Sequence, residues 1–114
     1  MLNNVVLVGR LTADPELKEV GKEGKVVNFT VAVPRSYKNS DGEYETDFIQ
    51  CNVWNNIAEN MSEYCKKGDL VGVKGSLQTS SFEDKDGNKR YKTDVRVDRV
   101  TFLSSKKEDE KDEK

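Results

Sequence analysis

One segment of this 114-residue chain has the periodicity of an amphipathic helix, and the segments around it have the patterns of β-strands. In Asn56–Lys67, apolar residues recur at i, i+1, i+4, i+7 and i+8, which places them on one helical stripe. Its first residue and Glu59 resemble a capping box, while its two final lysines and Gly68 suit a helix C-terminus. We therefore expect a mainly β fold with a single helix.

The strand-like segments set the order of the fold. Asp14-Pro15 breaks the first segment, which continues after a kink as Glu16–Val20, and Pro34 should end the second, which leaves Arg35–Glu43 as a loop. The expected strands are Asn3–Leu11, Lys25–Val33, Glu45–Trp54, Asp69–Thr79 and Arg90–Phe102. Three strands, a helix and two strands form the order of an OB-fold, an all-β five-stranded barrel with one α-helix between strands 3 and 4.

Local irregularities in the last two strands suit a coiled barrel wall. Gly72 and Gly75 interrupt one strand and suggest a bend or a bulge. The apolar phase of the last strand shifts near its middle, which predicts a bulge near Asp98. Asp86-Gly87 between the two strands is typical of a hairpin turn.

Composition excludes several classes of function. The chain has 19 Lys or Arg and 21 Asp or Glu, a net charge of −2, and no His. The absence of His excludes an imidazole base and weakens zinc or copper sites, and the sequence has no glycine-rich phosphate loop. A metal-dependent nuclease built from Asp47, Asp94 and Asp98 is conceivable, although their spacing does not require it. We expect no enzymatic activity, no cofactor and no metal.

Cysteine usage and the N-terminal sequence predict a cytoplasmic protein. The sequence has no run of about 18 apolar residues and no signal-peptide pattern, so we expect neither a membrane span nor secretion. Cys51 and Cys65 lack CxxC spacing, and two buried reduced thiols are favoured over a disulfide or a metal pair.

Residues 1–104 should form the domain, and residues 105–114, which are all polar or charged, should be a disordered tail.

The segment Glu45–Trp54 carries the strongest functional signal. Its odd-numbered face suits a core, whereas its even-numbered face is polar except for Phe48 and Trp54, which lie about 20 Å apart in an extended strand. Tyr37 precedes this strand in a loop, and Phe82 precedes the Asp-Gly turn. Because every base has a π-face, four aromatic rings on a polar surface form a candidate platform for stacking unpaired bases.

Polar and basic side chains accompany these rings. Gln50 and Asn52 lie between Phe48 and Trp54 in the sequence, where they can hydrogen-bond bases or phosphates. Arg10 faces either solvent or a polynucleotide groove. The basic residues adjacent to the loop aromatics are Arg35, Lys38, Lys85, Lys89 and Arg90. The near-neutral net charge argues against a strongly basic nucleic-acid binder, so any basic surface must be local.

A structural interpretation of the aromatic residues competes with the functional one. Aromatic side chains in strands usually pack, and a twisted sheet can bury both faces against an arm or a second subunit. Phe48 fits either interpretation, whereas polar neighbours favour function for Trp54, and the loop setting favours function for Tyr37 and Phe82. The other aromatic residues of the strands are assigned structural positions: Phe29 and Phe102 in the core, Tyr44 and Tyr91 as structural or hairpin-lining residues.

Five segments of the chain resemble the bacterial and bacteriophage single-stranded DNA-binding protein family. They read MLNNVVLVGRLTADPEL, FTVAVPRSY, TDFIQCNVWNNIAEN, KKGDLVGVKGSLQT and DGNKRYKTDVRVDRVTFL, and the likeness runs from Met1 to about Leu103. The resemblance implies an OB-fold that assembles as a homotetramer and wraps single-stranded DNA in replication, recombination and repair, without enzymatic activity or a cofactor. By position, the family's stacking aromatic residues correspond to Tyr37, Phe48, Trp54 and Phe82.

The chain departs from the family pattern in its charges. Family members commonly carry basic residues at the positions of Asn4, Asn55, Asn56, Gln78 and Ser80. Because fewer cations release fewer counterions, we expect weaker binding and a shallower salt dependence than in a typical member. The sequence also ends EDEKDEK, without the terminal apolar pair that closes the acidic, partner-recruiting tip of family members. Tail-mediated partners are therefore in doubt, and the chain is either a viral or mobile-element form or a shortened one.

The expected function is sequence-tolerant binding of single-stranded DNA in a bacterial nucleoid or a phage-infected cell. Bases would stack on the four rings, and Arg10, Arg35 and Lys38 would place phosphates. The alternative is an interaction module, an OB-fold adaptor of the primosome type whose aromatic face binds protein, which the near-neutral charge favours. The first strand is apolar on both faces, which permits a subunit interface without requiring one. Self-association is therefore an implication of the resemblance.

Overall fold

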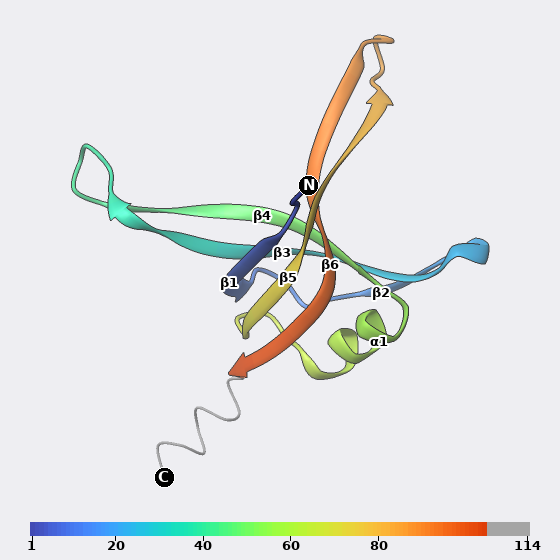
Figure 1. Cartoon of the computed structure of the whole chain (residues 1–114), viewed down its shortest axis with the longest axis horizontal. Helices are drawn as coiled ribbons and strands as arrows, with labels where there is room; N and C mark the ends of the chain where they lie inside the picture. Colours follow the sequence, from blue (N-terminus) through green and yellow to red (C-terminus); the bar gives the residue numbers. More distant parts are fainter. Residues whose placement is uncertain (105–114) are drawn as a thin grey trace.

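The computed structural model describes residues 1–104, except for the side chains of residues 23 and 104, and its fold is almost entirely β. The expected tail, residues 105–114, lies outside the described residues. No helix in the described part of the chain is long and apolar enough to cross a membrane. The elements shown in Figure 1 are β1 (Val5–Leu11), β2 (Leu17–Val20), a 3₁₀ turn η1 (Gly21–Glu23), β3 (Gly24–Lys38), β4 (Tyr44–Trp54), α1 (Asn55–Tyr64), β5 (Leu70–Glu83) and β6 (Lys89–Ser104).

The strands close into a barrel in the order β1–β3–β4–β6–β5–β1 (Figure 1). All neighbouring barrel strands are antiparallel except β4 and β6, which run parallel and pair Cys51 with Val95 and Asn52 with Arg96. The short β2 is an additional strand that pairs with β3, where the kinked continuation of the first strand was expected. The barrel, with α1 between its third and fourth strands, confirms the OB-fold.

Alternation along the strands sends every second side chain into one core. On β4, Cys51 and Val53 are buried and Ile49 packs against the core, as the odd-numbered face predicts. Helix α1 packs against β3, β4 and β6 and buries Ala58 and Met61 completely. The other buried members of the core are Leu11, Val27, Phe29, Val31, Cys65, Val71, Val73, Val95 and Val97. The even-numbered face of β4 is therefore left outside this core.

The barrel wall bends at the expected bulge between β5 and β6. The ladder passes from Lys74 to Gly75 on β5 while it skips Asp98 on β6, which confirms the bulge predicted there. A Cβ atom at Gly75 would overlap the carbonyl oxygen of Arg96, so glycine permits the two strands to come this close. Gly72, by contrast, keeps regular ladder pairing.

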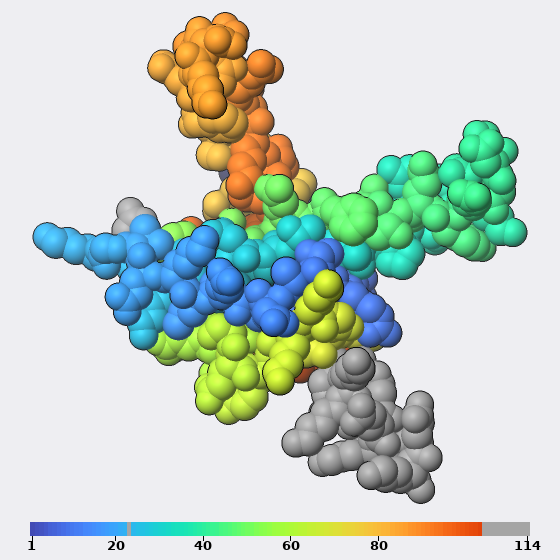
Figure 2. All heavy atoms as spheres, turned by 180° about the vertical axis from the view of Figure 1, so that it is seen from behind, coloured from blue at the N-terminus to red at the C-terminus, as the bar shows by residue number. Residues whose placement is uncertain are grey.

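Two hairpin arms extend from the barrel, and they project in different directions in Figures 1 and 2. We define the β3–β4 arm as residues 34–46 and the β5–β6 arm as residues 78–94. Pro34 was expected to end its strand, but β3 continues to Lys38. That prediction is wrong because a proline, which has no N–H to donate, is tolerated where the ladder is irregular, and the register shifts between Pro34 and Lys38.

Both arm tips are stabilised by the same pattern of hydrogen bonds between a side chain and the backbone. The Oδ1 atom of Asn39 accepts hydrogen bonds from the N–H groups two and four residues ahead, at 2.9 and 3.0 Å. The Oδ1 atom of Asp84 does the same at 3.0 and 2.9 Å. Gly87 has a φ of +79°, which confirms the Asp86-Gly87 turn. Each tip is therefore determined by its own local sequence.

Helix α1 begins without the expected capping box. It spans Asn55–Tyr64, with Trp54 as the N-cap residue and no side-chain hydrogen bond from the cap. Asn56 therefore lies inside the helix. Glu59 does not reach back to the helix start as a capping box requires, because it binds the Nζ atom of Lys25 at 2.7 Å. The long-range contact with β3 replaces the local one.

The cationic end expected for the helix lies in the turn that follows it. The backbone of Cys65 is extended, which stops the helix before the two lysines. The N–H of Lys66 donates to the carboxylate of the buried Asp69 at 2.9 Å. Gly68 has a φ of +92°, so its left-handed geometry is confirmed, although it closes this turn and not the helix itself.

Phe102 lies outside the core, contrary to expectation, whereas Phe29 is buried as expected. The side chain of Phe102 is 48% exposed, and its ring centroid is 6.4 Å from that of Tyr64. The ring lies near the end of β6 beside α1, where packing covers only part of it. Apolar alternation alone does not show where a strand reaches the rim of a barrel.

Candidate nucleic-acid interface

The four aromatic residues singled out from the sequence lie on the surface of the barrel and its arms. The side chains of Tyr37, Phe48 and Phe82 are 64%, 67% and 52% exposed, and that of Trp54 is partly buried. Among the described residues, none of the four pairs with another aromatic ring. The four are therefore separate rings at the surface, and nothing in the described chain packs over Phe48 enough to make it a core residue.

Phe48 shares its face of the sheet with Arg10. In the ladders, Phe48 lies opposite Ala32 of β3, and Ala32 lies opposite Arg10 of β1. Directly paired residues point to the same face, so Arg10 and Phe48 are two strand spacings, about 10 Å, apart on one surface. The guanidinium Nη1 of Arg10 donates to the carbonyl oxygen of Gly68 at 2.9 Å. This hydrogen bond holds the Arg10 side chain in place beside a cavity of ≈ 370 Å³.

Trp54, at the other end of β4, is held by two contacts. Its indole Nε1–H donates to Oδ1 of Asn52 at 3.0 Å. The guanidinium carbon of Arg96 lies 5.2 Å from the centroid of the Trp54 ring, within the range of a cation–π contact. Arg96 reaches the ring because its backbone pairs with Asn52 in the parallel β4–β6 ladder. Asn52 therefore fixes the orientation of the indole.

A polar groove lies beside Gln50, between Phe48 and Trp54 on β4. Its volume is ≈ 290 Å³, and β3, β4 and β6 contribute its walls. Its polar lining consists of Asn28, Thr30, Gln50, Lys92 and Asp94. Amide, hydroxyl and ammonium groups can all hydrogen-bond a base edge or a phosphate, so the position expected for Gln50 suits its expected role.

Arg35, expected to place a phosphate, is engaged by two carboxylates of β4. Its Nε and Nη2 atoms donate to Asp47 at 3.1 and 3.0 Å, and its Nη1 atom donates to Glu45 at 2.8 Å. The hydrogen bond from Arg35 lowers the pKa of Asp47, and the same bond raises the pKa of Arg35. The charge of Arg35 is therefore neutralised within the β3–β4 arm.

The other cations of the arms lie against neighbouring side chains. The Nζ atom of Lys38 is 5.7 Å from the centroid of the Tyr44 ring, and that of Lys89 is 5.7 Å from the Tyr91 ring. Both tyrosines are more than half exposed along the hairpins. Arg90 binds the tip aspartate of the β5–β6 arm at 2.8 Å. Lys38 and Lys89 are thus the arm cations that face rings without a carboxylate partner among residues 1–104.

Two cations near the candidate interface were missed by the sequence analysis. Lys92 and Arg96 of β6 lie beside β4, although they are far from it in the sequence. Lys92 lines the polar groove with its Nζ atom 3.9 Å from Asp94, and Arg96 lies against the ring of Trp54. The available signal was the alternation of polar residues at these positions of the last strand, but only the parallel β4–β6 pairing shows what they face.

The geometry offers no support for a nuclease. No group of three or more potential metal-binding side chains forms within residues 1–104. Asp47 is bound by Arg35, and Asp94 lies near Lys92. These carboxylates are therefore occupied by cations of the chain itself.

The two cysteines are buried free thiols, as expected. Burial, with a smaller effect from Asp94, raises the pKa of Cys51 to about 12. Burial, with a smaller effect from Asp69, raises the pKa of Cys65 to about 11. Both thiols stay protonated at neutral pH, so neither is suited to act as a nucleophile or a metal ligand.

A closed OB-fold barrel with exposed rings on one strand and on two arms has the features of a single-strand nucleic-acid-binding protein. The sequence matches the Single-strand binding protein family over residues 2–103. The chain therefore belongs to this family.

Curated relatives carry names that agree with the family. Single-stranded DNA-binding protein 3 of Listeria innocua is 51% identical over 106 residues, which cover 93% of this chain and 66% of the relative. Single-stranded DNA-binding protein B of Bacillus subtilis is 47% identical over 106 residues, 93% of this chain and 94% of the relative. Single-stranded DNA-binding protein 1 of Clostridium acetobutylicum is 46% identical over 108 residues, which cover 94% of this chain and 98% of the relative. The chain thus spans just under two thirds of the first relative and nearly all of the other two.

Proposed function

We propose that this protein binds single-stranded DNA without sequence preference, and so protects and organises exposed strands in replication, recombination and repair. The observation that carries the proposal is that the rings of Tyr37, Phe48 and Phe82 are more than half exposed on the barrel and its arms. Unpaired bases of any sequence stack on such rings, whereas the bases of a duplex are already stacked. Family membership and the names of the relatives support DNA binding over a primosome-type adaptor.

The proposal gives each candidate residue a role. Bases stack on the four rings, Gln50 and Asn52 hydrogen-bond the strand or orient a ring, and Arg10 and Lys38 place phosphates. Arg35 would contact a phosphate by exchanging one of its two carboxylates for it. The protein acts by binding and not by catalysis, in the cytoplasm of a bacterial or phage-infected cell.

Fluorescence of the single tryptophan tests the proposal directly. Titration with oligo-dT at low salt should quench the emission of Trp54, because a stacked base lies against the indole. A duplex of the same length serves as the control and should quench weakly. An unchanged emission at low salt, with no shift of a labelled oligo-dT in anisotropy, would contradict DNA binding and favour the adaptor.

The weak basicity of the surface predicts a shallow salt dependence. The exposed positions where family members commonly carry cations hold Asn4, Asn55, Asn56, Gln78 and Ser80. Each missing phosphate contact removes about 0.7 from the slope of log K against log salt on single strands. We expect a smaller slope than for a relative with basic residues at these positions, and an equally steep slope would contradict the expectation.

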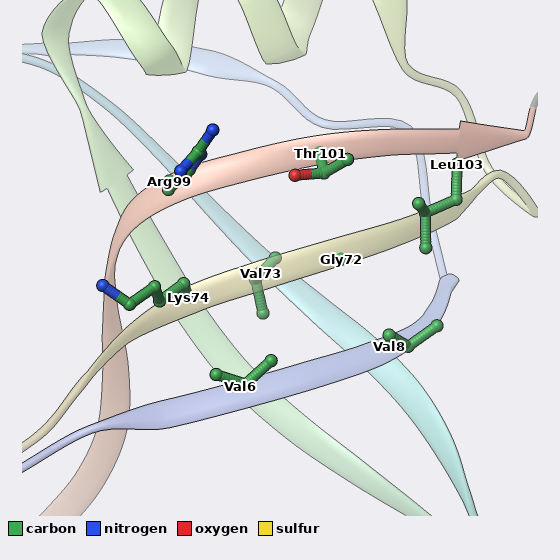
Figure 3. Close-up of a pocket in the computed structure, with 8 residues that line it drawn as sticks. All are labelled: Val6, Val8, Gly72, Val73, Lys74, Arg99, Thr101 and Leu103. Atoms are coloured by element: carbon green, nitrogen blue, oxygen red, sulfur yellow. The ribbon is translucent and has the colours of Figure 1, made fainter.

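We also propose that the protein self-associates, as a homotetramer. Val6 and Val8 of β1 are 65% and 50% exposed, although Val5 and Leu7 on the opposite face pack against the core. Figure 3 shows Val6 and Val8 on an outer face that β1 shares with β5 and β6, beside Leu103, and this face holds a mostly apolar hollow of ≈ 320 Å³. Native mass spectrometry should show four chains, and Val6→Glu should lower that number; a monomeric wild type would refute self-association.

A further inference from the structure

Arg96 differs from Arg35 and Arg90 in what surrounds its charge. Its side chain is exposed, and its guanidinium carbon lies 5.2 Å from the centroid of the Trp54 ring. Arg35 and Arg90 each bind carboxylates. Arg96 forms no ion pair with any carboxylate in the described part of the chain. The charge beside Trp54 is therefore not neutralised there, and it is open to an anionic ligand.

The backbone places this cation and this ring as one unit. Asn52 pairs with Arg96 in the parallel β4–β6 ladder, and the side chain of Asn52 accepts the indole N–H of Trp54 at 3.0 Å. On its other side, β6 is held close to β5 because Gly75 leaves room for the Arg96 carbonyl. The positions of the two side chains are thus set by three strands of the barrel, and not by either hairpin arm.

We propose that Arg96 is a DNA-binding residue, and that its guanidinium binds the phosphate of the nucleotide whose base stacks at Trp54. The proposal rests on the proposed function and specifies one of its contacts. A guanidinium recognises phosphate through paired N–H donors, and an exposed arginine side chain can turn from a ring to a phosphate beside it. Arg96 thereby supplies, from β6, a positive charge close to Trp54, where Asn55 and Asn56 carry none.

The test compares three variants by their salt dependence of oligo-dT binding, measured by anisotropy of a labelled oligonucleotide. Arg96→Gln should weaken binding at low salt and reduce the slope of log K against log salt by about 0.7 for each chain that contacts the strand. Arg96→Lys should keep a slope near that of wild type, because it keeps the charge. Lys66→Gln removes an exposed charge beyond the far end of α1 from Trp54, and should change neither affinity nor slope.

The outcomes separate a phosphate contact from a structural role. A loss in Arg96→Gln that is equal at all salt concentrations, with an unchanged slope, would show that Arg96 only supports Trp54 and would overturn the proposal. Equal slopes for Arg96→Gln and Lys66→Gln would overturn it as well. If wild type does not bind oligo-dT at all, it is the proposed function that fails.

A measurement on the wild-type protein covers the case in which the glutamine variant does not fold. The Nε–H resonance of Arg96 in nitrogen-15 NMR should shift on addition of oligo-dT, because the guanidinium exchanges the ring for a phosphate. An Arg96 signal that stays unchanged while the Trp54 indole signal shifts would contradict the proposal.

Discussion

The two ends of strand β4 combine a ring with an arginine in opposite ways. At the arm end, Phe48 is 67% exposed and no cation of the described residues lies over its ring, while Arg35 is bound by two carboxylates on the opposite face of β4. At the helix end, Trp54 is partly covered, and Arg96 lies against it without an ion pair among the described residues. When an arginine that is already paired with carboxylates meets a phosphate, few counterions are released. An unpaired arginine releases more of them. Within the described part of the chain, β4 therefore carries one ring with an unpaired arginine against it, Trp54, and one ring without a cation over it, Phe48.

Removal of the Trp54 ring should reduce the affinity for single-stranded DNA more than any other change considered at the two ends of β4. Trp54→Ala should cost about 3 kcal/mol of binding free energy, or roughly 150-fold in affinity for oligo-dT, at the upper end of the range for one stacked base. The ring is large, its orientation is fixed by Asn52, and its loss also separates the stacked base from Arg96. Anisotropy of labelled oligo-dT measures the change. Tyr91→Ala, which removes an exposed ring outside the proposed contacts, should have little effect.

Removal of the Phe48 ring should have a smaller effect that does not depend on salt. Phe48→Ala should cost about 1 kcal/mol of binding free energy, or roughly 5-fold in affinity, because the ring is smaller and no cation of the described residues lies over it. The slope of log K against log salt should equal that of wild type. A flattened slope in Phe48→Ala would remove the distinction between the two ends of β4.

Loss of the ion pair in the arm should affect mobility more than binding. Arg35→Gln removes the contacts to Asp47 and Glu45, which span the part of β3 where the ladder is irregular. We expect faster amide hydrogen exchange over residues 34–46, a loss of affinity smaller than that of Phe48→Ala, and an unchanged salt slope. A slope that falls as much as in Arg96→Gln would show that Arg35 meets phosphate as a free cation, without the proposed exchange of a carboxylate.

Acidification should give the smallest difference between the two ends of β4, because only the arm end holds a carboxylate–arginine pair. The pKa of Asp47 is lowered from 3.8 by the hydrogen bond from Arg35, so the pair stabilises the arm fully above that value. The contribution is lost as pH falls through the lowered pKa, so the protection of the β3–β4 arm against hydrogen exchange, relative to intrinsic rates, should fall only below about pH 4. Asp47→Asn should abolish this pH dependence. The emission of Trp54 should remain constant over the same range, because neither of its partners, Asn52 and Arg96, is a carboxylate.

Local patterns predicted much of the fold because their causes are local. Alternation at Ile49, Cys51 and Val53 identified the core face of β4, and therefore the outward face that carries Phe48 and Trp54. The shift in apolar phase found the bulge at Asp98, since a bulge exchanges the two faces of its own strand. The Asp86-Gly87 turn was predictable for the same reason.

The features that were not predicted depend on residues distant in the sequence. The limits of α1 are set by Lys25 and by the buried Asp69, neither of which belongs to the helix. The contact of Arg96 with Trp54 requires the parallel pairing of two strands separated by α1 and β5. The pairing of Arg35 with Asp47 requires that β3 continue past Pro34, where the local rule for proline predicts an end. In each case a long-range partner outweighs a local preference.

Gly75 fits tightly against the backbone of Arg96, so the packing of the barrel wall affects the position of the Arg96 side chain on the surface. Any side chain at position 75 would force β5 and β6 apart and so displace the strand segment that carries the guanidinium. A substitution in the barrel wall would thus move a surface side chain that was not itself replaced. If Arg96 binds DNA as proposed, a substitution at this glycine should therefore weaken DNA binding as well as the fold.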